Sequence, residues 1–272
     1  MTQRHTQSGF TLVELIMVIV IMGVIGGAVA VFMKSPIDAY FDTTRRAGIA
    51  DVADTTVRRM ARDIRKALPN SIRLGGTGGN QCIEFIPTRM GGRYRVEEIV
   101  AGDGTSLDFS TTDTTFNMLG QNTGLPADQQ IRANDEVAIY NLGIPGADAY
   151  AGDNTAVVSG VVDGMETSVT IAATRFPLAS GANRFHVIPG DETIVSYMCA
   201  GGRLFRNAGY AYSPSCPTPT AGTTPIIATE ATCNFAYSAA DIRNALVQLS
   251  LTFTNSGESV SIYHEVHVNN TP

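Results

Sequence analysis

The sequence predicts an α+β protein in which a long N-terminal helix packs on the antiparallel β-sheet of a globular head. Apolar residues dominate the first part of the chain and then recur at helical spacing as far as Pro69. Beyond that proline, short strand-like segments alternate with turns rich in Gly, Asp, Asn and Pro. The chain has 272 residues, of which 44% are hydrophobic, so the head is large enough to bury a core.

Composition narrows the classes of function that we expect. The formal net charge is -6 at pH 7, and basic residues do not cluster with aromatic ones outside one helical stretch, so we expect no nucleic-acid partner. Only 16% of the residues are charged, while Gly, Thr, Ser, Asn and Ala are abundant. This balance is typical of a turn-rich β domain outside the cytosol.

The N-terminal apolar segment is long enough to cross a membrane. Residues 15–33 contain no charge, and the apolar run that precedes them is interrupted only by Thr11 and Glu14. A helix of about 20 residues spans the roughly 30 Å hydrocarbon core of a bilayer. We therefore predict a transmembrane helix over residues 10–33.

Charges on the flank orient this helix. Arg4 and His5 precede it, and residues 1–9 contain no acid. The positive-inside tendency then holds the N-terminus in the cytoplasm and sends the rest of the chain across the membrane. We expect a single-pass protein of the inner membrane with a periplasmic head.

The order of features differs from that of an ordinary secretory signal. Such a signal has an apolar core of about 7 to 15 residues followed by a small-residue cleavage site. Here the small residue, Gly9, lies before the apolar run, and Glu14 lies inside it. A charge at mid-bilayer costs about 2.5 to 3.5 kcal/mol, and although Glu14 is nearer the end of the span, it still calls for a partner.

The segment Ser8-Gly9-Phe10-Thr11-Leu12-Val13-Glu14-Leu15 resembles the cleavage and methylation signature of type IV prepilins and type II secretion pseudopilins. The resemblance implies that residues 1–9 are a leader, which a membrane-embedded prepilin peptidase removes by cutting between Gly9 and Phe10. It also implies that the new amine of Phe10 is N-methylated, and that the chain assembles with other pilin or pseudopilin subunits through its N-terminal helix. The alternative is an ordinary signal anchor with a chance acid.

The physical chemistry of Glu14 is consistent with an assembly role. A carboxylate in hydrocarbon is stabilised by an ammonium group, and cleavage creates one on Phe10 of a neighbouring subunit. Processing of the leader thereby permits assembly.

The helix is predicted to continue beyond the membrane as a periplasmic half over residues 34–69. Pro36 follows the apolar stretch, and we expect a kink or break there because its ring removes a backbone donor and crowds the preceding turn. Pro69 ends the helix. Between them, apolar residues three and four positions apart form one stripe: Ile49, Ala53, Val57, Met60, Ile64 and Leu68.

Basic side chains cover the other faces of this periplasmic half: Arg45, Arg46, Arg58, Arg59, Arg62, Arg65 and Lys66. We interpret them as a solvated helix surface with local pairs, such as Asp54 with Arg58 at i,i+4. A groove for an acidic partner is the alternative.

The head, residues 70–272, contains segments that we predict to be strands: 82–87, 97–100, 136–140, 168–172, 194–199 and 203–206. The last two flank Ala200-Gly201-Gly202 and form a predicted hairpin. A second, longer hairpin is predicted from 244–255 and 259–267 around Ser256-Gly257-Glu258.

Residues from about 101 to 183 have weaker periodicity, and we interpret them as an insertion in the head. Within it, residues 101–105 (AGDGT) are echoed by residues 151–155 (AGDNT). Two copies of a turn do not make a repeat architecture, and convergent turn chemistry explains both.

A second resemblance lies in the head. Residues 195–197 and 202–206 are similar to a strand pair of the larger minor pilins and J-type pseudopilins. The ending 257–270 resembles the MshO family of minor pilins of the mannose-sensitive haemagglutinin (MSHA) pilus. The resemblance covers about a third of the head and implies a pilin-like fold.

The four cysteines, Cys82, Cys199, Cys216 and Cys233, suit two disulfides in an exported head. We favour Cys216 with Cys233 across a proline-rich loop, which leaves Cys82 with Cys199. Cys199 with Cys216 and Cys82 with Cys233 is the competing arrangement, and buried thiols are a third reading.

No enzyme motif is present, and we expect neither catalysis nor a cofactor. His264 and His267 miss the zincin spacing by one residue and should face opposite sides of a strand, so we expect no metal site there. Four aspartates in glycine-rich turns are weighed as calcium ligands, but turn and capping roles are commoner: Asp103, Asp108, Asp153 and Asp163.

Taken together, these features predict a minor pilin that initiates or caps a type IV pilus of the MSHA type. A large head with an insertion is awkward to repeat along a thin fibre. The alternatives are a J-type minor pseudopilin of a type II secretion system and a tip adhesin, although the chain has no tryptophan to stack on a sugar.

Overall fold

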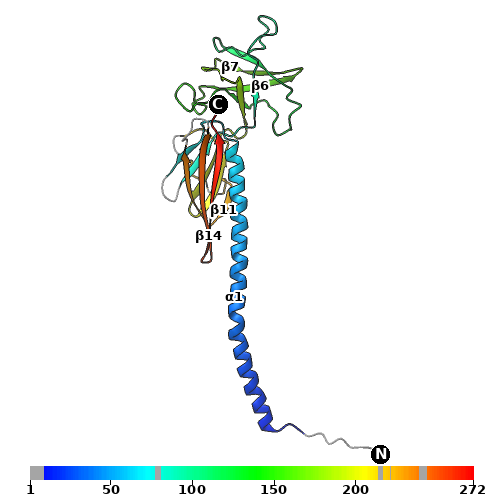
Figure 1. The fold of residues 1–272 in the computed structure, drawn as a ribbon, viewed down its shortest axis with the longest axis vertical. Helices are drawn as coiled ribbons and strands as arrows, with labels where there is room; N and C mark the ends of the chain where they lie inside the picture. The colour runs from blue at the N-terminus through cyan, green and yellow to red at the C-terminus, as the bar shows by residue number, and fades with distance from the viewer. Residues whose placement is uncertain (1–8, 77–80, 214–216, 221, 239–243) are drawn as a thin grey trace, which may run out of the picture.

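The computed structural model describes residues 9–76, 81–213, 217–220, 222–238 and 244–272. One helix, α1 (Leu12–Arg65), forms a stem that projects far below the head (Figure 1). Its side chains are almost all exposed as far as residue 48, and Ile49 is the first to be buried. The free part of the stem is therefore about 55 Å long at the helical rise of about 1.5 Å per residue.

The helix passes through Pro36 without a break, so the expected interruption at this residue is wrong. Figure 1 shows a gentle curve along the lower half of the stem and no sharp bend. The φ angle to which proline is restricted is itself helical, so the ring removes one hydrogen bond without forcing the chain out of the helix. The helix ends at Arg65, where the N–H of Lys66 bonds the carbonyls of Asp63 and Ile64, a few residues before Pro69.

The upper part of α1 packs on two small sheets. One has the order β1-β2-β9-β10-β11 and the other β12-β13-β14. Their strands are β1 (Arg73–Gly75), β2 (Cys82–Phe85), β9 (Val195–Ala200), β10 (Arg203–Ala208), β11 (Ile226–Thr229), β12 (Ala231–Ser238), β13 (Asn244–Asn255) and β14 (Glu258–Asn269). We call this assembly of α1 and two sheets the stem unit.

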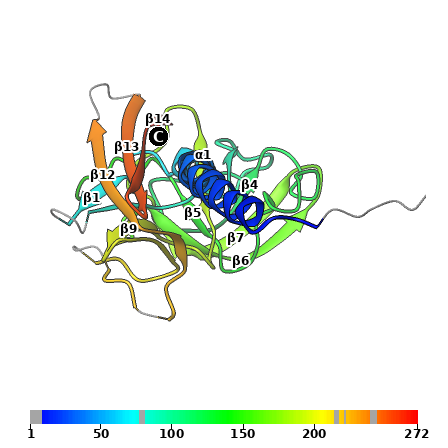
Figure 2. The same ribbon diagram turned by 90° about the horizontal axis from the view of Figure 1, so that it is seen from below.

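The predicted apolar stripe of the helix forms its core contact. Ile49, Ala53, Val57, Met60 and Ile64 are buried in one cluster with inward-facing residues of both sheets. Viewed along the stem, α1 lies next to β14 at the edge of the three-stranded sheet (Figure 2).

A second unit is formed by residues 90–188 and lies beyond the C-terminal end of α1 (Figure 1). Its single antiparallel sheet has the order β3-β8-β5-β6-β7-β4 and its own core around Phe116, Phe176 and Phe185. The strands are β3 (Met90–Arg93), β4 (Asp113–Met118), β5 (Glu136–Ala138), β6 (Thr155–Asp163), β7 (Thr167–Thr174) and β8 (Arg184–Ile188). Because β2 and β9 pair with each other, this unit is inserted between two neighbouring strands of the stem unit.

The two units are joined directly after the helix. Asn141 is buried, and its Nδ2 donates to the carbonyl of Pro69 at 2.7 Å, while the Nδ2 of Asn70 donates to the carbonyl of Asn141 at 2.8 Å. The Tyr150 hydroxyl donates to the carbonyl of Ser71 at 2.9 Å. These bonds satisfy backbone groups that would otherwise be buried without partners.

Arg73 adds an electrostatic contact to this junction. Its guanidinium lies 3.6 Å from the centre of the Tyr150 ring and bonds Asp148 at 2.9 Å. A cation over an aromatic face is attracted by the ring quadrupole. Residues of both units therefore fix the second unit against the top of the stem.

The predicted α+β class is confirmed, and most predicted strands are present with shifted ends. The segment 97–100 is the exception, because it forms a bent loop in which side chains capture the backbone. The N–H of Val100 donates to Asp103 Oδ2 at 2.8 Å, and the N–H of Gly102 donates to Glu98. Such local bonds compete with a strand ladder.

Both predicted hairpins are also confirmed. The turn residues Gly201 and Gly202 have φ values of 56° and 71°, and Ser256 and Gly257 have values of 51° and 86°. Two successive residues with positive φ define the tight turn that matches the twist of paired strands.

Candidate processing and assembly site

The N-terminal signature lies at the start of α1, where its residues form a helix cap. Thr11 has extended backbone angles, and its Oγ1 accepts from the N–H of Glu14 at 3.3 Å. In return, Glu14 Oε2 accepts from the N–H and the hydroxyl of Thr11, each at 3.1 Å. This reciprocal capping box satisfies the first donors of the helix and places a carboxylate at its positive end.

Only one oxygen of the Glu14 carboxylate takes part in the cap. Among the described residues, no hydrogen bond is made to Oε1. The cap holds the side chain against the first turn of the helix. The geometry therefore leaves one acceptor oxygen for a group outside this chain.

Gly9 and Phe10 precede the cap and are open to solvent. Phe10 is 89% exposed, and a side chain at Gly9 would meet no atom of this chain within 4 Å. A requirement for glycine at this position would thus arise from an enzyme that binds the chain, not from the packing of the chain itself. The Gly9–Phe10 bond is sterically accessible to a protease.

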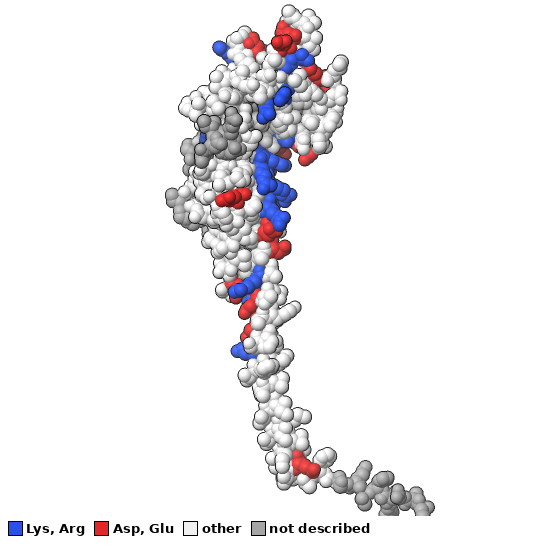
Figure 3. Space-filling model, viewed as in Figure 1, with Lys and Arg blue, Asp and Glu red and all other residues white. Residues whose placement is uncertain are grey.

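The lower stem presents apolar side chains on all faces. Within the described chain, α1 is the one helix that is long and apolar enough to cross a membrane. Its apolar stretch is not buried by any other part of the described protein. Figure 3 shows this part of the stem free of charge except for an acidic spot near its end. An apolar surface of this extent indicates contact with lipid or with other proteins.

A long apolar stem with a capped acid in its first turn and a β-rich head is a pilin-like architecture. Residues 4–30 match the family model of the prokaryotic N-terminal methylation motif. This motif marks type IV pilin-like proteins and pseudopilins, which prepilin peptidase processes, which assemble with other pilins and which are structural proteins. No curated protein and no solved structure matches the chain.

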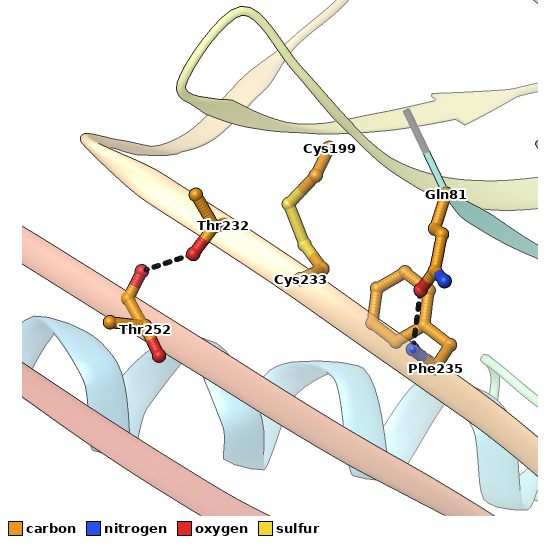
Figure 4. The surroundings of a disulfide bond; sticks show 6 residues. All are labelled: Gln81, Cys199, Thr232, Cys233, Phe235 and Thr252. Carbon is orange, nitrogen blue, oxygen red and sulfur yellow. Dashed lines mark hydrogen bonds between the residues drawn. A yellow bond between two sulfur atoms is a disulfide. The ribbon is translucent and has the colours of Figure 1, made fainter. Parts of the chain in front are cut away.

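The disulfide in the stem unit differs from both predicted pairings. Cys199 on β9 is bonded to Cys233 on β12, with their Cα atoms 5.8 Å apart, and the bond crosses between the two sheets (Figure 4). Cys82 is also disulfide-bonded, and Cys216 lies outside the described residues. Because Cys199 and Cys233 are bonded to each other, both predicted arrangements are wrong. The favoured one paired Cys216 with Cys233 and Cys82 with Cys199, and the competing one paired Cys199 with Cys216 and Cys82 with Cys233.

A charged cluster that the sequence analysis did not identify fixes the helix to the first sheet. Asp63 Oδ2 accepts from the hydroxyl of Tyr197 at 2.6 Å and from Arg206 Nε at 3.0 Å. Arg206 also donates to both carboxylate oxygens of Glu192 at 2.9 and 3.0 Å. Its hydrogen bonds to Glu192 raise the pKa of Arg206, and burial raises the pKa of Tyr197.

A buried acid lies on β2. Glu84 is 4% exposed and accepts from the hydroxyl of Tyr210 at 2.8 Å. Burial raises the pKa of Glu84 because the charged form loses solvation, and the Tyr210 bond opposes this rise. Glu84 and Asp63 both serve the packing of the stem unit.

Three of the aspartates weighed as calcium ligands use their carboxylates to accept hydrogen bonds from residues near them in the fold. Asp103 accepts from Val100 and Thr105, and Asp108 accepts from Ser110. Asp163 accepts from Thr123 and Thr167, which lowers its pKa to about 2. Within the described ranges, no three His, Cys, Asp or Glu side chains are grouped to hold a metal ion.

The two histidines near the C-terminus face opposite sides of β14, as predicted. His264 is half-buried on the side toward α1, whereas His267 is exposed on the other side. They therefore cannot ligate one metal as a helical His pair does.

Proposed function

We propose that this protein is a minor pilin that initiates or caps a type IV pilus of the MSHA type. In this proposal, residues 1–9 are the leader, 10–33 the transmembrane helix, 34–69 the periplasmic half of the stem and 70–272 the head, with an insertion at about 101–183. The chain is first held in the inner membrane with its N-terminus cytoplasmic and its head periplasmic. It then enters the fibre.

Prepilin peptidase hydrolyses the bond between Gly9 and Phe10, and the new Phe10 amine is N-methylated. Gly9 and Phe10 are exposed and precede the helix, which supports this step. The cap at Thr11 lies immediately after the cut and persists in the mature chain, because both of its partners, Thr11 and Glu14, remain.

Assembly uses the charge of Glu14. An ammonium on Phe10 of the neighbouring stem approaches the acceptor oxygen of Glu14 that the cap leaves open. Moving a single charge from water into hydrocarbon has a large unfavourable free energy. Pairing the carboxylate with the ammonium offsets much of this desolvation free energy. The apolar faces of the two stems pack around the pair.

The observation that carries the tip assignment is the position of the second unit. It lies beyond the C-terminal end of α1, at the opposite end of the molecule from the membrane segment (Figure 1). In a fibre built from side-by-side stems, this is the space into which the subunit ahead would extend. A subunit that fills it with its own chain is suited to the end of the fibre. The resemblance of residues 257–270 to MshO minor pilins supports the MSHA type.

A J-type minor pseudopilin of a type II secretion system is the second candidate, because the methylation motif and the stem suit it equally. Immunogold labelling of sheared fibres with an antibody against the head tests the assignment. We expect label at one end of pili. Label along the whole shaft contradicts a tip position, and its absence from pili combined with loss of secretion on gene deletion favours the pseudopilin.

A further inference from the structure

The strand β14 forms an open edge of the stem unit. It pairs with β13 on one side, and no strand of the described chain pairs with its other side. Its register with β13 is unbroken from Asn255↔Glu258 to Asn244↔Asn269. Long, regular edges without proline, lysine or a bulge are templates for pairing with another chain.

The hairpin geometry identifies which backbone groups face outward. The two-residue turn makes Asn255 and Glu258 a hydrogen-bonded pair, and such pairs alternate along the ladder. Ser259, Ser261, Tyr263 and every second residue beyond them therefore direct N–H and C=O away from β13. No backbone hydrogen bond of these residues to another described segment is present.

A groove lies between this edge and α1. It has a volume of about 600 Å³, and its lining includes Val57 and Ala61 from the helix and Ile262 from β14. Arg58, Arg62 and Arg65 line the same groove. Figure 3 shows the band of basic side chains that follows the helix beside the head.

Two of these arginines have no acidic partner among the described residues. Arg58 pairs with Asp54, whereas Arg62 and Arg65 form no ion pair with a described side chain. Arg62 and Arg65 are three positions apart, about 4.5 Å along the helix axis. Alternate side chains of a strand are about 6.7 Å apart and point to the same face. Because arginine side chains are long and have many rotamers, both can reach acids at alternate positions of a strand alongside β14.

We propose that the edge of β14 binds an extended acidic segment from the head of a neighbouring pilin-like subunit, as an added strand. The segment bonds the outward backbone of Ser261 and Tyr263, and acids at alternate positions lie over Arg62 and Arg65. This inference rests on the proposed function for the nature of the neighbour. A second copy of this chain fits poorly, because its own β14 carries one acid on the face toward the helix, Glu258, which already pairs with Arg46, and no two acids at alternate positions.

The test uses the full chain in cells that express its assembly system. A photo-reactive benzoylphenylalanine replaces Tyr263, which is 58% exposed on the outer face of β14. A second probe replaces Val18 in the stem, and captured peptides are identified by mass spectrometry. We expect the head probe to capture a segment of another pilin-like subunit with acids at alternate positions.

Two variants with matched controls separate pairing from charge. Ser261→Pro removes an outward N–H without removing a ladder bond, whereas Ser261→Ala keeps that N–H. Arg62→Glu reverses a groove charge, whereas Arg59→Glu reverses an exposed charge outside the groove. We expect the captured yield to fall about five-fold or more with Ser261→Pro and with Arg62→Glu, and to be unchanged in both controls. Protease resistance of the head in each variant shows that it is folded.

The outcomes are distinct. Capture at position 18 without capture at position 263 overturns the docking edge but leaves the pilin function standing. Capture at neither position overturns both. Capture of a second copy of this chain, of lipid only, or of a segment without acids overturns the proposed partner, as does an unchanged yield with Arg62→Glu. Should Ser261→Pro fail to fold, Arg62→Glu alone decides.

Discussion

Replacing Cys199 and Cys233 together by serine removes the covalent link between the two sheets of the stem unit. The disulfide joins residues 34 positions apart in the chain. The chain-entropy relation for a loop of that length gives a stabilisation of about 3.8 kcal/mol. The double substitution avoids leaving a reactive thiol and leaves Cys82 unchanged.

We expect this loss of stability to be confined to the stem unit. The second unit has its own core and joins the stem unit through a small junction, so it should open independently. Hydrogen exchange of the full chain in detergent, read by mass spectrometry, measures each unit separately. We expect the slowest amides of β9, β12 and β13 to exchange about several hundred-fold faster, since each 1.4 kcal/mol is about tenfold. Amides of β6 and β7 should be unchanged.

The control for this experiment is Ser196→Ala, a change of a buried residue on β9 that leaves the disulfide intact. Equal acceleration in both units would show that they unfold as one body and refute the reasoning. Unchanged exchange in β12 and β13 would show that packing, not the bond, holds the two sheets together.

Three further predictions concern single acids and the processing site. Gly9→Leu should abolish leader removal with the head still folded, because the chain itself has room for a side chain there; N-terminal sequencing of membrane fractions measures it, and a mature start at Phe10 would contradict it. Glu14→Gln should leave membrane insertion and cleavage intact but reduce crosslinking to other pilins. The reduction should be larger than that caused by Leu15→Ala, which changes packing but not charge. If Glu14→Gln and the wild type crosslink equally, Glu14 is not an assembly contact. Glu84 has a raised pKa in the folded state, so the fold binds its proton more tightly than the unfolded chain does, and stability falls as pH rises through that pKa. Urea unfolding across about pH 4 to 8 should show this fall in the wild type and a weaker one in Glu84→Gln, and identical pH profiles would argue against a titrating Glu84.

Features that are local in sequence could be predicted, because neighbouring residues determine them. The helix stripe from Ile49 to Ile64 follows from helical spacing, and the turns at Gly201 and Gly257 follow from the need for positive φ. The cleavage signature is likewise a contiguous string of residues. None of these depends on which distant segments meet.

The sheet of the second unit and the disulfide partner depend on such distant contacts. Strand β3 is only 4 residues long, and it becomes a strand by pairing with β8, far along the chain. Cys233 meets Cys199 because β12 packs across from β9, an arrangement of two sheets that loop composition does not encode. The proline-rich loop before Cys233 suggested a local bond, and sheet packing selected a different partner.

The position of the second unit relative to the stem is set by bonds that begin where the helix ends. Asn141 bonds Pro69, Tyr150 bonds Ser71, and Arg73 lies over Tyr150, so the first residues after α1 hold the inserted sheet directly. Asp63 fixes the last turn of the same helix to β9 and β10. A rotation of the second unit would have to break buried hydrogen bonds at the top of the stem, each of which costs about 1 to 3 kcal/mol when its partner is left unsatisfied. The orientation of the second unit is therefore fixed by the end of the stem helix, which is a property that the proposed position at the end of a fibre requires.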